Sequence, residues 1–171
     1  VWQPVDNLSL SADWFVTDIR NRIMATSYIA GWSLAELSPG AQAILNQHGV
    51  DGAVYFTNAV GTRTQGYDLR LDYQDELANG HRWQVQAAFQ QAKTRINRVS
   101  SAPEVLGVDM NALVLDRFAR VTLEQGQPQT AFNVSGQYHA PAWSLSLGLR
   151  RHGSYASTYN EQRVHFGARW V

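Results

Sequence analysis

The stretch YDLRLDYQ, residues 67–74, alternates apolar and polar residues along its whole length. Tyrosine or leucine stands at every odd position, and aspartate, arginine or glutamine stands at every even position. Successive side chains of a β-strand point to opposite faces, so this alternation predicts a strand with one apolar and one polar face. The stretch therefore favours an all-β fold.

Five further segments repeat the alternation. With the first stretch, their apolar register comprises Leu8, Leu10, Ala12, Trp14, Val16, Tyr67, Leu69, Leu71, Tyr73, Trp83, Val85, Ala87, Phe89, Phe132, Val134, Gly136, Tyr138, Ala140, Trp143, Leu145, Leu147, Leu149, Val164, Phe166, Ala168 and Trp170. None of these positions is charged, whereas the interleaved positions include Asp13, Asp68, Arg70, Asp72, Arg82, Arg150, Arg163 and Arg169. A Lys or Arg at the bilayer midplane costs about 2–4 kcal/mol on the lipid face of a barrel and little on its lumen face. The asymmetry therefore indicates lipid against the apolar register.

Three features separate a membrane barrel from a soluble sandwich or lipocalin-type barrel, which places its apolar register inward. Short turns near 78–80 and 140–141 alternate with long connections at 24–53, 93–130 and 152–162, as in outer-membrane barrels. The apolar register places aromatic residues beside both short turns, as in an interfacial girdle: Tyr73, Trp83, Tyr138 and Trp143. The segments also run about ten residues, beyond the usual five or six of globular sheets. These features predict an antiparallel transmembrane β-barrel segment.

Composition narrows the function classes. The 171 residues balance 14 Lys and Arg against 14 Asp and Glu, which offers no basic footprint for nucleic acid. No run of about 18 apolar residues predicts a transmembrane helix. Val1 opens no signal peptide, so we expect the start of a precursor to be missing. The absence of cysteine excludes disulfides, thiolate metal sites and cysteine nucleophiles.

The sequence holds no catalytic or metal-binding motif, and we expect no cofactor. Its five histidines, at 48, 81, 139, 152 and 165, stand singly and lack the paired spacing of a metal site. No serine lies in a G-x-S-x-G elbow, and no glycine-rich phosphate loop is present. Asp68 and Asp72 share a strand face, but Arg70 between them favours a charge-balanced lumen network over a catalytic carboxylate pair.

The long connections carry local signals. Ser38 and Pro39 before an apolar run, with Gly49 after it, predict a short helix over about residues 38–49. We interpret this helix as a packing element that orders the loop rather than as a lid. The run at 112–123 fits either a second helix or an upward extension of the barrel wall, and its periodicity leaves both open.

The alternation of the first segment breaks after Val16. Ile19 and Ile23 stand on the opposite register, and Phe15 interrupts the polar one. A bulge or bend near the barrel rim would account for both observations.

Residues 54–59 (VYFTNA) and 64–69 (TQGYDL) resemble the Y-x-N-A and G-[VY]-[DE]-L stretches that mark an inward barrel strand in TonB-dependent outer-membrane receptors. Residues 8–23 resemble the outward strand before it, and EQGQP at 124–128 resembles the segment that precedes a later strand. The resemblance covers essentially the whole chain in the family's order.

This resemblance implies about six strands of a larger, 22-stranded barrel, with a short helix in an extracellular loop. We expect the strands near residues 7–23, 53–75, 81–96, 130–139, 142–152 and 162–171. The family's plug domain and TonB contact segment have no counterpart in these residues, and closing strands should follow Val171.

The implied parent protein is no enzyme. It lies among the lipids of the outer membrane of a Gram-negative bacterium and binds and imports a scarce small nutrient, such as a ferric siderophore, haem, cobalamin or a glycan. The energy would arrive through TonB.

We expect ligand contacts in the loops at 27–52, 97–129 and 152–162, although the sequence identifies no binding residue. Candidates by residue type alone are Tyr28, Trp32, Arg98, Tyr155 and Tyr159; aromatic residues in such loops more often pack the loop itself. Two alternatives stay open: a passive porin or structural barrel, and a soluble lipid-binding β-sheet protein.

Overall fold

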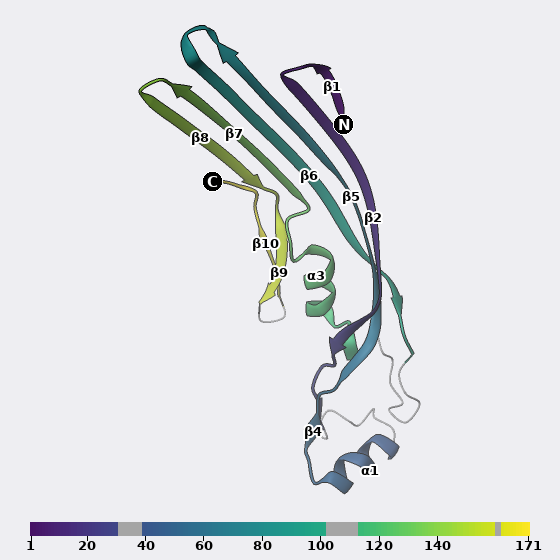
Figure 1. Cartoon of the computed structure of the whole chain (residues 1–171). Helices are drawn as coiled ribbons and strands as arrows, with labels where there is room; N and C mark the ends of the chain where they lie inside the picture. Colours follow the sequence, from purple (N-terminus) through teal and green to yellow (C-terminus); the bar gives the residue numbers. More distant parts are fainter. Residues whose placement is uncertain (31–38, 102–112, 160–161) are drawn as a thin grey trace.

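A computed structural model describes residues 1–30, 39–101, 113–159 and 162–171. An open antiparallel sheet of seven strands dominates it, in the order β1-β2-β5-β6-β7-β8-β11 (Figure 1). The strands are β1 (Trp2–Val5), β2 (Leu8–Ala25), β5 (Phe56–Leu77), β6 (His81–Val99), β7 (Thr130–Ala140), β8 (Trp143–His152) and β11 (Arg169–Trp170). The expected antiparallel barrel segment is confirmed, and its sheet does not close on itself.

Smaller elements fill the connections. Two short antiparallel pairs lie outside the main sheet: β3 (Ile29–Ala30) with β4 (Gly52–Ala53), and β9 (Tyr155–Tyr159) with β10 (Gln162–Phe166). The described residues include the α-helices α1 (Pro39–His48) and α3 (Arg117–Gln125) and the short 3-10 helix η2 (Ala78–Gly80). None of the described helices is both long enough and apolar enough to cross a membrane.

The strand register joins the apolar positions into one surface. Across five adjacent strands, one row consists of Leu10, Leu71, Ala87, Val134 and Leu149. The next row, on the opposite side of the sheet, consists of Ser11, Arg70, Ala88, Asn133 and Arg150. We call these two surfaces the apolar face and the polar face.

The apolar face is exposed. Trp14 is 65% accessible, Leu69 45% and Leu147 68%, although burial of such side chains normally contributes most of the folding energy. The buried clusters lie elsewhere, around Ile29 and Leu45 and around Val60 and Val114, near the long loops. A contiguous apolar surface of this kind indicates contact with lipid or protein outside the chain.

Both short turns form as expected and lie at the same end of the sheet, opposite the helices (Figure 1). In the turn between β5 and β6, Asn79 has φ 73° and Gly80 has φ 76°, a left-handed conformation that Asn and Gly tolerate best. The turn between β7 and β8 joins the paired residues Ala140 and Trp143.

Aromatic rings border both ends of the apolar face. At the turn end, the Tyr138 ring centroid lies 4.5 Å from that of Trp83 and 5.1 Å from that of Trp143. At the loop end, Trp14 pairs directly with Tyr67. The strands between these borders span roughly 20–26 Å, allowing for tilt, which suits the apolar band of an outer-membrane barrel.

The predicted bulge lies further along the first segment than expected. Pairing of β2 with β5 is continuous from Leu8 to Ile19, shifts between Ile19 and Arg22, where Asn21 has φ 56°, and shifts again between Arg22 and Ile23. The predicted break in the alternation directly after Val16 is therefore wrong, because Ile19 lies on the polar face of an uninterrupted stretch of strand.

Phe15 also lies on the polar face without a bulge. Its ring covers Gly66, where a Cβ atom would come within 2.8 Å of Phe15 Cζ and 2.0 Å of the Gln91 carbonyl oxygen. The aromatic ring thus occupies the space that glycine leaves open.

The expected last strand, 162–171, is wrong as a single element. Residues Gln162–Phe166 leave the main sheet and pair with β9, whereas Arg169 and Trp170 pair with β8 and Val171 exchanges two backbone hydrogen bonds with Arg150. The ring of Phe166 stacks on Tyr155 at 4.7 Å and 9°, and Gly167 separates the two pieces. The β9–β10 hairpin thus forms in place of a sixth long strand of the main sheet.

The first segment also has a partner that the alternation did not reveal. The strand β1 pairs with the start of β2 as a hairpin at the edge of the sheet. It contains Pro4, which an edge strand tolerates because proline has no N–H to donate.

The expected loop helix is present, and a second helix forms in the run that the sequence left open. Helix α1 ends with Gly49 at φ 63°, where the Gly49 and Val50 amides donate to the Asn46 and Leu45 carbonyls. It buries Ala41 and Leu45 against Ile29, which agrees with a packing element; Ser38 lies outside the described residues. Within the run at 112–123, residues 117–123 belong to helix α3, so this part of the run is a helix rather than an extension of the barrel wall.

If the apolar face contacts lipid, two adjacent substitutions in the full-length protein should change its free energy of unfolding by unequal amounts. Leu147→Arg places a charge on the apolar face, two residues inside the row of Tyr138, and should lower the free energy of unfolding by about 2 kcal/mol. Ser146→Arg places the same charge on the polar face and should change it by less than about 1 kcal/mol. Guanidinium titrations in lipid vesicles measure both, and equal losses would contradict the assignment.

Candidate functional site

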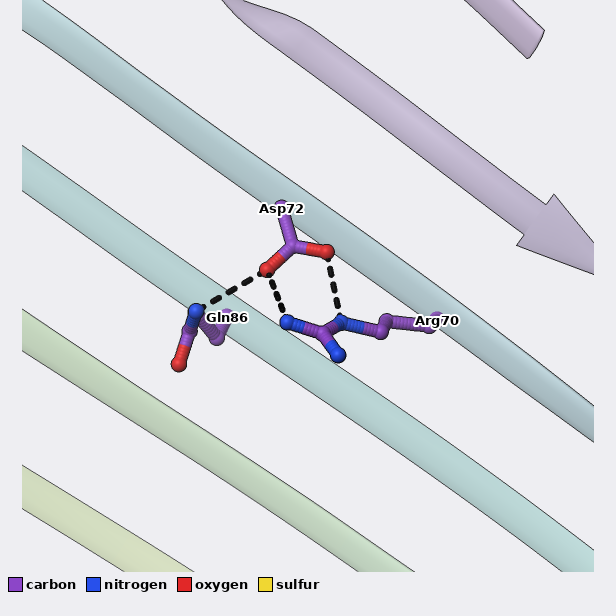
Figure 2. Close-up of polar contacts among 3 residues, drawn as sticks. All are labelled: Arg70, Asp72 and Gln86. Atoms are coloured by element: carbon purple, nitrogen blue, oxygen red, sulfur yellow. Dashed lines mark hydrogen bonds and ion pairs between the residues drawn. The ribbon is translucent and has the colours of Figure 1, made fainter. Parts of the chain in front are cut away.

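The centre of the polar face carries a charge-balanced network. Arg70 Nε donates to Asp72 Oδ2 at 2.7 Å and Arg70 Nη2 donates to Asp72 Oδ1 at 2.9 Å (Figure 2). Gln86 Nε2, on the neighbouring strand β6, donates to the same Oδ1 at 2.9 Å. A bidentate pair of this kind occupies both oxygens of the carboxylate. Asp72 is therefore a structural acceptor; these contacts contain Arg70 and Asp72 of the predicted network but not Asp68.

A second polar site lies where β6 extends beyond the end of β7. The pairing of β6 with β7 ends at Gln91 and Thr130, so residues 92–99 have no strand beside them on that edge. Helix α3 and the segment after it take the place of the strand. The Ala92 amide donates to the Gln129 carbonyl at 2.8 Å, and the Ile96 amide donates to Glu124 Oε1 at 3.0 Å.

Helix α3 is fixed at both ends. Its N-cap Asp116 accepts from the Ala119 amide at 2.7 Å, which satisfies an otherwise unpaired helical donor. At its C-terminal end, Arg163 of β10 donates to Gln125 Oε1. Leu123 packs against the buried cluster around Val60 and Val114. The helix and the β9–β10 hairpin are thus held together beside the edge of β6.

These three elements enclose a pocket of about 650 Å³, which we call the edge pocket. Its basic side chains are Lys93 and Arg95 from β6 and Arg163 and His165 from β10; Glu124 is its acidic one. Pockets of roughly 300–1,000 Å³ suit small ligands. The balance of charge favours a ligand with anionic or strongly polar groups.

The candidate loop residues do not gather at one site. Tyr155 lines the edge pocket, and the Tyr28 ring lies against Gly52. Tyr159 is 72% exposed, and Arg98 is exposed beside Gly61. Trp32 lies outside the described residues.

The sequence did not reveal that the basic side chains of the edge pocket lie close together. Arg163 was assigned to the polar register of a barrel strand, and Lys93 and Arg95 to the end of another. Only the departure of β10 from the sheet brings them together.

One loop hydroxyl beside the cluster around Ile29 and Leu45 has a shifted pKa. Burial raises the pKa of the Tyr55 phenol, whose oxygen has no hydrogen-bond partner among the described residues. No group of three or more His, Asp or Glu residues within those same ranges is arranged to hold a metal ion.

An open antiparallel sheet with one exposed apolar face, one polar face and aromatic borders defines a segment of β-barrel wall. A family model described as "TonB dependent receptor-like, beta-barrel" matches residues 1–170. The chain therefore belongs to the TonB-dependent receptor β-barrel family, whose members are transporters rather than enzymes. No curated protein and no solved structure was found to match the chain.

The contact between Glu124 and the edge of β6 predicts a local effect in the full-length protein. Glu124→Ala leaves the Ile96 amide without its acceptor and should speed hydrogen exchange over residues 94–98 by about tenfold or more. Glu124→Gln keeps an acceptor oxygen and should stay within about threefold of the wild type. Exchange measured by mass spectrometry checks both, and unchanged exchange in the alanine variant would contradict the role of α3 as a cover for this edge.

Proposed function

We propose that this chain is a late barrel segment of an outer-membrane receptor that binds and actively imports a scarce nutrient, such as a ferric siderophore. The observation that carries the proposal is the family match over residues 1–170. The exposed apolar face supports it, because a barrel wall must turn such a face toward lipid.

In this proposal, other parts of the parent protein complete the barrel. The sheet ends in β1 on one side and β11 on the other, and unpaired strand edges are not tolerated in lipid. Further strands would pair with these edges, and a plug domain would lie against the polar face. The TonB complex would act on that plug, since energy must enter from the inner membrane.

The edge pocket is the best supported ligand contact of the segment. It lies on the side of the long loops, which are extracellular if the short turns are periplasmic. Many ferric siderophores are anionic, and the basic side chains of Lys93, Arg163 and His165 would complement them. The Arg70–Asp72 network would line the route below with fixed, mutually neutralising charges.

The test is uptake of radioactive iron carried by a panel of siderophores, in cells that express the full-length protein. We expect binding in the presence and absence of TonB, and uptake only when TonB is present. Uptake without TonB would overturn the proposal in favour of a passive porin, and recovery of the protein in the soluble fraction would favour a soluble lipid-binding protein.

The same assay tests the edge pocket. Lys93→Gln combined with Arg163→Gln should weaken binding of the transported siderophore by about tenfold or more, because each position can supply a charge-assisted hydrogen bond. Arg169→Gln is the matched control, since this arginine lies on β11 and does not line the pocket. Equal binding by all variants would exclude the pocket as a contact while leaving TonB-dependent uptake intact.

A further inference from the structure

The turn between β5 and β6 contains a reactive pair of residues, Asn79 and Gly80. Both are exposed, at the end of the sheet opposite the long loops. Asn79 is the only asparagine of the sequence that a glycine follows. Because glycine has no Cβ atom, nothing on Gly80 itself shields its backbone nitrogen from the asparagine side chain. The pair is therefore a candidate for spontaneous deamidation.

The reaction begins as a cyclisation within the chain. The Gly80 backbone nitrogen attacks Cγ of Asn79 and forms a C–N bond, and the side-chain nitrogen leaves as ammonia with the proton that the backbone nitrogen loses. The product is a five-membered succinimide ring. One water molecule then opens either C–N bond of this ring, which yields aspartate or isoaspartate at position 79. Water is the only co-reactant.

The closed turn holds the two reacting atoms apart. Asn79 has φ 73° and ψ 21°. In an L-residue this ψ places the nitrogen of the next residue nearly opposite Cβ about the Cα–C bond, so the Gly80 nitrogen points away from the side chain. Cyclisation requires the nitrogen and Cγ in near-attack contact. The peptide after Asn79 must therefore rotate before the ring can form.

The hairpin below the turn resists that rotation. Leu77 pairs with His81 directly beneath the turn, and Arg82 Nη2 donates to Glu76 Oε1 at 3.2 Å in the next row. Pairing of β5 with β6 then continues without a shift as far as Thr62. Rotation of the Asn79 peptide therefore requires the end of the hairpin to open, whereas an unfolded chain rotates there freely.

A second asparagine provides a control within the same chain. Asn21 is exposed and also has a left-handed φ, of 56°, but Arg22 follows it. The Cβ atom of Arg22 shields the nitrogen that would attack. The two asparagines thus share a backbone region and differ in the residue that follows.

We propose that Asn79 and Gly80 form a conformation-gated modification site. Asn79 deamidates in chains whose β5–β6 hairpin is open and stays intact in the assembled wall. Isoaspartate routes the main chain through its side chain, so it adds a methylene group and a negative charge to the turn. The lengthened turn no longer matches the Leu77–His81 pair. A chain that stays unfolded long enough to react should therefore fold more slowly afterwards.

The test compares the full-length protein folded in lipid vesicles with the same protein unfolded in urea, at one mildly alkaline pH and one temperature. Water enriched in heavy oxygen labels each residue that passes through a succinimide. Peptide mass spectrometry with electron-transfer fragmentation separates aspartate from isoaspartate. We expect label at position 79 to appear at least about tenfold faster in the unfolded protein than in the folded one. In the unfolded protein it should appear at least about tenfold faster at position 79 than at position 21.

Two variants separate the chemistry from its consequence. Gly80→Leu, measured only in urea, should slow labelling of Asn79 by about tenfold or more, and a failure to fold cannot imitate that loss. Asn79→Asp has the charge of the product without its additional methylene group. Wild-type chains enriched in isoaspartate should therefore fold into vesicles at least about threefold more slowly than this variant.

Equal labelling of the folded and unfolded protein would overturn the gate. Absence of label at position 79 in urea, or unchanged labelling in Gly80→Leu, would overturn the site itself. Equal folding rates of isoaspartate-containing chains and Asn79→Asp would overturn the predicted consequence. The site does not depend on the transported nutrient, so each of these results leaves TonB-dependent uptake to be decided by its own assay.

Discussion

Backbone hydrogen bonding in register, combined with side-chain alternation, is the constraint on which the rest of the structure depends. Each strand of the wall satisfies its neighbour's peptide groups, so the position of one residue fixes the face of every residue in its row. A slip of one residue would bring Arg70 onto the apolar face, where Leu69 and Leu71 now lie. Contact of its charge with lipid would cost several kcal/mol. The two faces therefore maintain the register as much as they result from it.

The sites arise where this constraint is relaxed. On the loop side, β6 continues past the end of β7, and helix α3 supplies acceptors such as Glu124 in place of a strand. Beyond the lipid band, the outward positions no longer need to be apolar, and the same register places Arg63 opposite Arg95. The edge pocket thus occupies the zone in which the wall still has strand geometry beyond its apolar band.

Much of the wall was predictable because its rules are local. Of the six strands that alternation predicted, five form as long strands with the expected two faces; the short turn near 78–80 and the helix that ends before Gly49 also form as predicted. The departure of β10 was not predictable, since it depends on the stacking of Phe166 on Tyr155 and on a contact with α3. The edge pocket depends on that departure, which is why its basic residues went unrecognised.

The central claim, lipid against one face and water against the other, is tested most directly by spin labelling of β8 in the full-length protein in lipid vesicles. The segment contains no cysteine, so single cysteines can be placed at each position from 144 to 150 without interference from it. The account predicts high oxygen accessibility at 145, 147 and 149, and high accessibility to a polar nickel complex at 144, 146, 148 and 150. Low oxygen accessibility at the odd positions, as in a protein core, would contradict it.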